Sequence, residues 1–145
     1  MNYVKWLAAS TALAVAGTAN AGEFSSTITA ASEYDFRGFS QSAKDPALQA
    51  SLDYAFDNGF AIGAWASNVD FEPLDGDIEL DLYLSYGGEI NENVSWSAGL
   101  VYYMYPGSSS VTIVEDEETI ELPAIGEYAE YYVSLDVGPI GPDYI

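Results

Sequence analysis

The chain has 145 residues, no cysteine and no histidine, and its 23 acidic against three basic residues give a formal net charge of −20 at pH 7. This balance argues against nucleic-acid binding, which needs clustered lysine and arginine to neutralise phosphates. With 49% hydrophobic and 14% aromatic residues, the chain is expected to fold and not to stay disordered.

The first 21 residues have the pattern of a cleaved secretory signal peptide. Lys5 precedes an apolar run at 7–17, and Ala19-Asn20-Ala21 matches an A-x-A cleavage site. The run is too short to cross a bilayer as a helix, which needs about 20 residues. We therefore predict an exported mature chain that begins at Gly22. It keeps two basic and all 23 acidic residues, a net charge of −21. Without disulfides, an exported chain of this size needs another source of stability, such as a large sheet or a membrane.

After the predicted signal peptide, apolar residues recur at every second position, in segments of about the 9 to 11 residues that a tilted membrane strand requires. Strands are predicted in residues 24–38, 47–57, 60–71, 78–86, 94–105 and 127–137. A tight turn is expected at residues 91–93, and residues 106–126 are expected to be a long connection.

The dipeptide Asn58-Gly59 predicts a two-residue hairpin turn, because a type I′ turn needs positive φ at both central residues. In that register Asp57 pairs with Phe60. Tyr54 would then lie opposite Gly63 and cover its exposed backbone.

The first predicted strand has one apolar and one charged face. Tyr34 and Phe36 fall on the apolar face, whereas Glu33, Asp35 and Arg37 fall on the other. In a soluble sandwich the apolar face is core, whereas in a membrane barrel it meets lipid and the charged face lines a lumen.

The connections decide between these two folds. Those after the second and fourth strands are short, and the others are longer and more polar, as in outer-membrane barrels with tight periplasmic turns and long external loops. We therefore expect an all-β, antiparallel, up-and-down transmembrane β-barrel, with a secreted sandwich as the alternative. Six strands are fewer than the usual minimum of about eight. Residues 22–145 are thus expected to be the N-terminal part of a longer barrel, and assembly into a homo-oligomer is the second option.

Several sequence blocks resemble the TorF-type family of outer-membrane porins. These are Ser32-Glu33-Tyr34-Asp35-Phe36-Arg37-Gly38-Phe39-Ser40-Gln41, Asp45-Pro46-Ala47-Leu48-Gln49 and Trp65-Ala66-Ser67-Asn68-Val69-Asp70-Phe71, with 79–83 and 101–106 extending them. The resemblance covers most of residues 22–138. It implies a β-barrel in the outer membrane of a Gram-negative cell, assigned as a porin. Members are longer than this chain, which implies further C-terminal strands.

The residue types argue against enzymatic activity. Without histidine and cysteine the chain lacks the commonest general base and a thiol nucleophile, and Lys44 is the one lysine after the predicted signal peptide. No cofactor is expected. Oxygen-rich loops such as 70–77 and 115–118 could hold Ca²⁺, but their spacing is not that of an EF-hand loop, and we predict no metal site.

The inward faces of the predicted strands carry carboxylates and a single guanidinium. The predicted pore-lining residues are Glu33, Asp35, Arg37, Asp53, Asp57, Glu79, Asp81, Glu130 and Asp136. A lumen lined with carboxylates concentrates cations and excludes anions. We therefore expect a porin-like channel for passive diffusion of small polar or cationic solutes, with outer-membrane lipid around it.

Two questions stay open on the sequence alone. The carboxylates could serve only to keep the inner face hydrated, in a non-conducting structural or adhesive protein with acidic, cation-binding loops. Arg37 is expected to bridge Glu33 or Asp35 to a carboxylate on the neighbouring strand, such as Asp53, and a role at a pore constriction is the alternative.

Overall fold

A computed structural model of the protein describes residues 10–19, 22–115 and 118–138. The strands are β1 (Ser10–Ala19), β2 (Gly22–Ala31), β3 (Asp35–Phe36), β4 (Phe39–Ser40), β5 (Ala47–Phe56), β6 (Phe60–Asn68), β7 (Ile78–Asn91), β8 (Val94–Met104), β9 (Val111–Glu115), β10 (Glu118–Leu122) and β11 (Tyr128–Val137). The predicted all-β class is confirmed. Within the described residues, no helix has the length and apolar character to cross a membrane.

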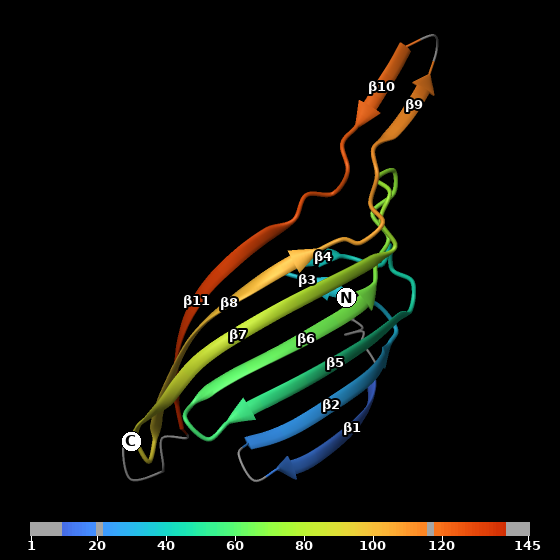
Figure 1. The fold of residues 1–145 in the computed structure, drawn as a ribbon. Coiled ribbons are helices and arrows are strands. Elements are labelled where there is room, and N and C mark those ends of the chain that lie inside the picture. Colours follow the sequence, from blue (N-terminus) through green and yellow to red (C-terminus); the bar gives the residue numbers. More distant parts are fainter. Residues whose placement is uncertain (1–9, 20–21, 116–117, 139–145) are drawn as a thin grey trace, which may run out of the picture.

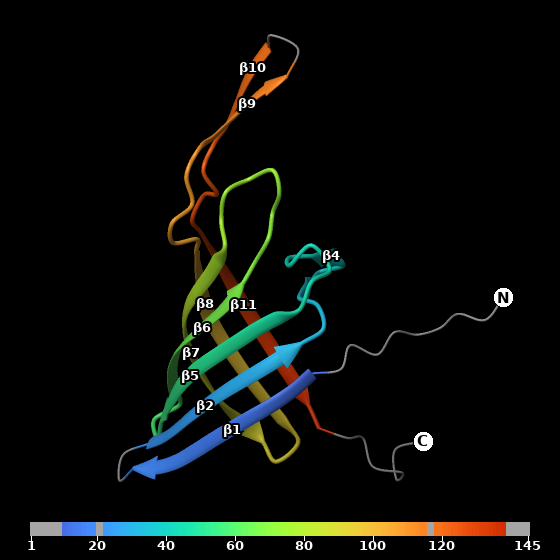
Figure 2. The same cartoon turned by 90° about the vertical axis from the view of Figure 1, so that its right-hand side faces the viewer.

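One large sheet contains seven of these strands, in the order β1-β2-β5-β6-β7-β8-β11. Every neighbouring pair in it is antiparallel. The sheet curls so that β11 passes behind β1 and β2 in the view of Figure 2. No pairing between described residues joins β1 to β11, and the sheet is open along that seam.

Six of the seven strands, from β2 to β11, overlap the predicted segments, but β7 continues past the predicted end at 86 to Asn91. The turn between β7 and β8 lies at residues 92–93, within the predicted 91–93. The seventh, β1, is formed by Ser10–Ala19, which the sequence assigns to a signal peptide. It pairs with β2 over ten residue pairs, from Ser10 with Ala31 to Ala19 with Gly22. Residues 20–21 of the predicted cleavage site lie outside the described residues, and cleavage stays a prediction.

The two faces of the sheet have opposite chemistry. Large apolar side chains of the outer face are solvent-exposed, and Leu48 and Val133 keep 63% and 82% of their surface. On the inner face Glu79 and Asp81 are only 2% and 8% exposed. This is the reverse of a soluble protein, in which ionised side chains are rarely buried without a partner. The predicted faces of the second, fourth, fifth and sixth strands are confirmed.

The predicted register of the β5–β6 hairpin is wrong by one residue. Gly59, at φ +89°, donates its backbone N–H to Phe56 O at 3.2 Å, and Ala55 pairs with Ala61. The loop therefore has three residues, in which a type I turn is followed by a left-handed glycine. A one-residue shift turns every side chain of β6 to the other face. Trp65 consequently lies on the inner face, and Tyr54 does not lie over Gly63.

The first predicted strand is also shorter than expected. β2 ends at Ala31, and the chain then forms the small hairpin β3–β4, in which Phe36 pairs with Phe39. Arg37 and Gly38 are its two turn residues, with φ +54° and +88°, as a type I′ turn requires. Asp35 Oδ1 stabilises this turn by accepting a hydrogen bond from Gly38 N at 2.9 Å. The apolar-out, charged-in assignment of this segment is therefore wrong.

The predicted long connection at 106–126 contains a hairpin of its own. Strands β9 and β10 pair from Val111 with Leu122 to Glu115 with Glu118, and project away from the sheet (Figure 1). Ser108 fixes the base of this projection, because its hydroxyl donates to Asp75 O and accepts from Ile125 N, each at 2.7 Å.

Candidate functional site

Tyrosine side chains on the inner face lie flat over glycines of neighbouring strands. Gly63 in β6 pairs directly with Tyr83 in β7, and the Tyr83 ring occupies the space that a Cβ at Gly63 would need. The Tyr83 hydroxyl reaches past the glycine and donates a hydrogen bond to Asp53 Oδ1 on β5. One residue thus connects three strands, and the predicted lumen residue Asp53 has a structural partner.

The same arrangement recurs between β8 and β11. Gly99 pairs with Tyr132, whose ring fills the position that a Cβ at Gly99 would take. Two residues along each strand, the paired Ser97 and Ser134 share a hydrogen bond of 2.7 Å. An aromatic ring over a strand glycine covers backbone that would otherwise be exposed. The inner wall is therefore lined by tyrosine rings as well as by carboxylates.

The β3–β4 hairpin folds over one end of the inner face. Tyr34, just before β3, packs edge-on against Trp65 of β6 with 5.3 Å between ring centroids. Phe36 lies 6.4 Å from the ring of Tyr103 on β8. The Tyr34 hydroxyl donates to Glu79 Oε1 at 3.0 Å. Burial, together with the Glu79 carboxylate, raises the pKa of Tyr34, so the hydroxyl keeps its proton and acts as a donor.

Arg37, at the tip of this hairpin, contacts β11, the strand at the opposite edge of the sheet from β1. Its guanidinium makes a bidentate pair with Glu130 of β11, with N–O distances of 2.9 and 2.6 Å. Its Cζ also lies 4.6 Å from the Phe36 ring centroid, and the Glu130 carboxylate raises the pKa of Arg37. The sequence predicted Glu33, Asp35 or Asp53 as partners. The structure corrects this, because the turn at 37–38 points Arg37 away from its own strand.

Beneath the hairpin, Glu79 and Asp81 occupy successive inward positions of β7. Asp81 pairs directly with Trp65 on one side and with Tyr103 on the other. Its Oδ1 atom is buried and has no hydrogen-bond partner. A buried carboxylate oxygen without a donor is costly and calls for an explanation.

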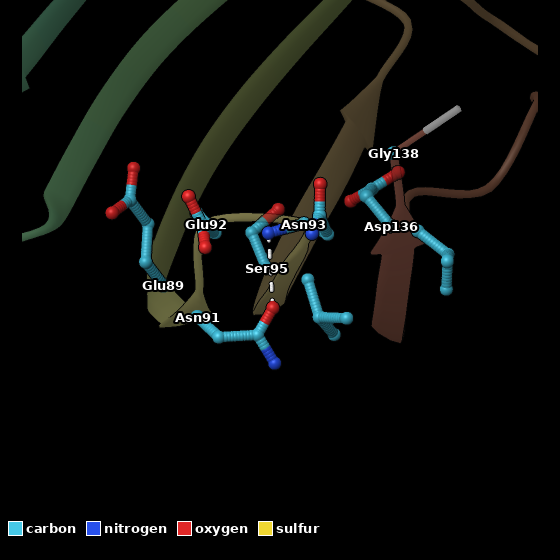
Figure 3. Close-up of a pocket in the computed structure, with 9 residues that line it drawn as sticks. Glu89, Asn91, Glu92, Asn93, Ser95, Asp136 and Gly138 are labelled. Carbon is cyan, nitrogen blue, oxygen red and sulfur yellow. Dashed lines mark hydrogen bonds between the residues drawn. The ribbon is translucent and has the colours of Figure 1, made fainter. Parts of the chain in front are cut away.

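The remaining predicted lumen residues are distributed over both ends of the sheet. Glu33 lies between β2 and β3, and Asp57 is exposed in the β5–β6 turn. Asp136 lines a hollow of about 260 Å³ at the opposite end, where Figure 3 shows it across the hollow from Glu89 and Glu92, with Asn93 and Ser95 between them. Within the part of the chain that the structure describes, no group of three or more acidic side chains could hold a metal ion.

Sequence reasoning missed the roles of Tyr34, Tyr83 and Trp65. The predicted alternation puts Tyr34 on the apolar face, and a hairpin register in which Asp57 pairs with Phe60 turns Trp65 outward. In the structure Tyr34 instead packs against Trp65 on the inner face. A tyrosine directly opposite a strand glycine is the one sequence signal that could have found Tyr83, and it becomes visible only once the Gly63–Tyr83 pairing is known.

Replacing Tyr34 by phenylalanine tests the anchor of the hairpin. Tyr34→Phe keeps the ring against Trp65 but leaves Glu79 Oε1 without its donor. We expect a loss of about 1–3 kcal/mol in the free energy of unfolding, measured by denaturant titration. Tyr131→Phe, at a side chain that is exposed on the outer face, serves as the matched control and should have almost no effect.

A family model described as "Bacterial protein of unknown function (Gcw_chp)" matches residues 15–138. The chain belongs to the Gcw_chp family. The match spans β2 to β11, so the strands of the inner face and the hairpin that covers it all lie within the family region. No curated protein and no solved structure matches the chain.

Proposed function

We propose that the protein is a porin-like channel of the outer membrane, through which small polar or cationic solutes diffuse passively. The observation that carries this proposal is the inverted sheet, with apolar side chains on the outside and buried carboxylates on the inside. Residues 1–21 then act as a cleaved signal peptide, and residues 22–145 form part of a β-barrel.

The outer face supports a lipid environment on physical grounds. Its exposed apolar side chains follow one another across the strands β2, β5, β6, β7, β8 and β11 and include Ile28, Leu52, Ile62, Leu84, Trp96 and Leu135. Soluble monomers rarely expose contiguous apolar patches above a few hundred Å². The strands of the sheet have 9 to 14 residues, enough to cross a bilayer when tilted, which takes about 9 to 11.

The inner face supports cation preference. Asp53, Glu79, Asp81, Glu130 and Asp136 all lie on it. Between residues 22 and 138 the basic residues are Arg37 and Lys44, and Arg37 is neutralised by Glu130. Negative walls of low dielectric attract cations and repel anions. No catalytic step is part of this proposal.

Planar-bilayer recording with the purified protein tests the proposal. We expect discrete conductance steps with reversal potentials that favour cations, and a reduced preference in Asp136→Asn, which removes one carboxylate at the open end of the inner face. An absence of steps, or a preference for anions, would refute the channel.

A second function has specific support in the hairpins. β3–β4 covers one end of the inner face, and β9–β10, with Glu115, Glu118 and Glu121, projects away from the sheet (Figure 1). A non-conducting structural or adhesive protein of the outer membrane would use such a projection to bind cations or partners. Membrane insertion without conductance, together with cell adhesion lost on deletion of 111–122, would favour this alternative.

Substitution of Arg37 tests whether the β3–β4 hairpin only stabilises the fold or also narrows the pore. The Arg37–Glu130 pair is largely solvent-exposed, with 65% and 31% of the two side chains accessible, and exposed pairs contribute little to stability. For Arg37→Ala we expect an unchanged unfolding midpoint, faster amide exchange at Phe39 and Ser40, and altered single-channel current. Arg37→Lys, which keeps the charge but not the bidentate geometry, should give an intermediate current. A lowered midpoint with unaltered current would favour a purely structural role.

A further inference from the structure

Glu79 and Asp81 form a pair of buried carboxylates without a basic partner. They are two residues apart on the inner face of β7, and both are almost inaccessible to solvent. The one ion pair among the described residues joins Arg37 to Glu130 and leaves these two acids without a cation. Glu79 accepts a hydrogen bond from Tyr34, whereas Asp81 Oδ1 accepts none. Two buried charges of the same sign are unfavourable unless a donor or a cation accompanies them.

Aromatic side chains surround Asp81. Its orphaned Oδ1 lies on a wall where Trp65 and Tyr103 are its direct neighbours on the adjacent strands. Tyr34 lies over this wall, with its ring against Trp65 and its hydroxyl on Glu79. The result is a carboxylate pair enclosed by aromatic rings and closed by the β3–β4 hairpin.

This chemistry favours an organic cation over a metal ion. Ca²⁺ takes about 6 to 8 oxygen ligands, and in the described residues no group of three or more acidic side chains is arranged so that it could hold a metal ion. An ammonium group instead needs a few acceptors, and the faces of tryptophan and tyrosine attract it through cation–π interactions. We propose that Glu79 and Asp81 bind a primary ammonium ion beneath the hairpin. The site would give the proposed channel a binding position for one class of cationic solute. It rests on the proposed function only in the assumption that the inner face lines the path of the solute.

Binding of methylammonium to the full chain in detergent tests this site. Trp65 flanks Asp81, and its fluorescence should change with methylammonium concentration, whereas Trp65→Phe should abolish that change. Asp81→Asn keeps the shape of the side chain and removes the charge, and we expect at least about a tenfold weaker affinity, with a similar loss in Glu79→Gln. Asp136→Asn, at the other end of the same face, should bind like the wild type and controls for nonspecific attraction to an acidic protein.

Thermal unfolding provides a second measurement that does not depend on fluorescence. Methylammonium should raise the melting temperature of the wild type but not that of Asp81→Asn, because a ligand stabilises only the state that binds it. Equal affinity in wild type and Asp81→Asn, no binding to the wild type, or displacement of methylammonium by equimolar Ca²⁺ would each overturn the proposal. Binding without conductance would retain this site and reject the channel, whereas conductance without binding would reject this site alone.

Discussion

Replacing Gly63 by alanine should destabilise the protein by about 3 kcal/mol, near the upper end of what overpacking costs. The Tyr83 ring occupies the position of the new methyl group and is held there by its hydrogen bond to Asp53. Ring displacement would break that bond and leave the half-buried Asp53 carboxylate with the Ser51 hydroxyl as its remaining side-chain donor. The measurement is the unfolding free energy from denaturant titration in detergent or lipid.

Gly88→Ala is the matched control for this substitution. Gly88 lies in the same sheet, but a Cβ there meets no atom within 4 Å. Alanine should therefore be neutral or slightly stabilising, because it restricts the unfolded chain. In the double variant Gly63→Ala with Tyr83→Ala, the combined loss should be smaller than the sum of the two single losses. Equal stabilities of Gly63→Ala and Gly88→Ala would show that the ring moves aside without cost.

Leu84→Arg should reduce the stability of the membrane-inserted protein by about 2–4 kcal/mol, if the outer face meets lipid as proposed. Leu84 lies near the middle of β7, on the outer face, and is paired with Ile62 and Leu100 on its two sides. An arginine there would be held in hydrocarbon. The measurement is reversible folding into phosphatidylcholine vesicles at graded urea concentration.

Ser85→Arg places the same charge one position along the strand, on the inner face. It should fold into vesicles nearly as well as the wild type, because its guanidinium would meet water and carboxylates. The opposite result, with Leu84→Arg neutral and more soluble in buffer, would mean that the outer face is exposed to water and would support a secreted protein.

The strands were predictable because each carries a strong contrast between its two faces. Residues 94–105 alternate without interruption, and the structure forms β8 from Val94 to Met104. Such alternation fixes which side chains share a face, although it does not say which face meets lipid. The contrast also explains why the carboxylates Asp53, Asp81 and Glu130 were correctly placed on one side.

The errors arose where a local pattern fits two structures. Asp57-Asn58-Gly59 is compatible with a two-residue or a three-residue loop, and what distinguishes them is distant packing such as the fit of Tyr83 over Gly63. The alternation through Phe36 continued past the point where β2 ends. A left-handed arginine at position 37 is uncommon for a residue with a side chain, and its partner Glu130 is 93 residues away.

The position of β1 at the edge of the sheet has a consequence for strand direction. Six antiparallel steps separate β1 from β11, so these two strands run the same way, whereas β2 and β11 run in opposite directions. Antiparallel single-chain barrels of bacteria have an even number of strands for this reason. While Ser10–Ala19 stays in place, the backbone groups along β2 are occupied and protected from chance pairing with other chains. If residues 1–21 are cleaved as the sequence predicts, the edge of β2 becomes free and has the direction that an antiparallel neighbour requires. On that proposal the sheet can be completed only after cleavage.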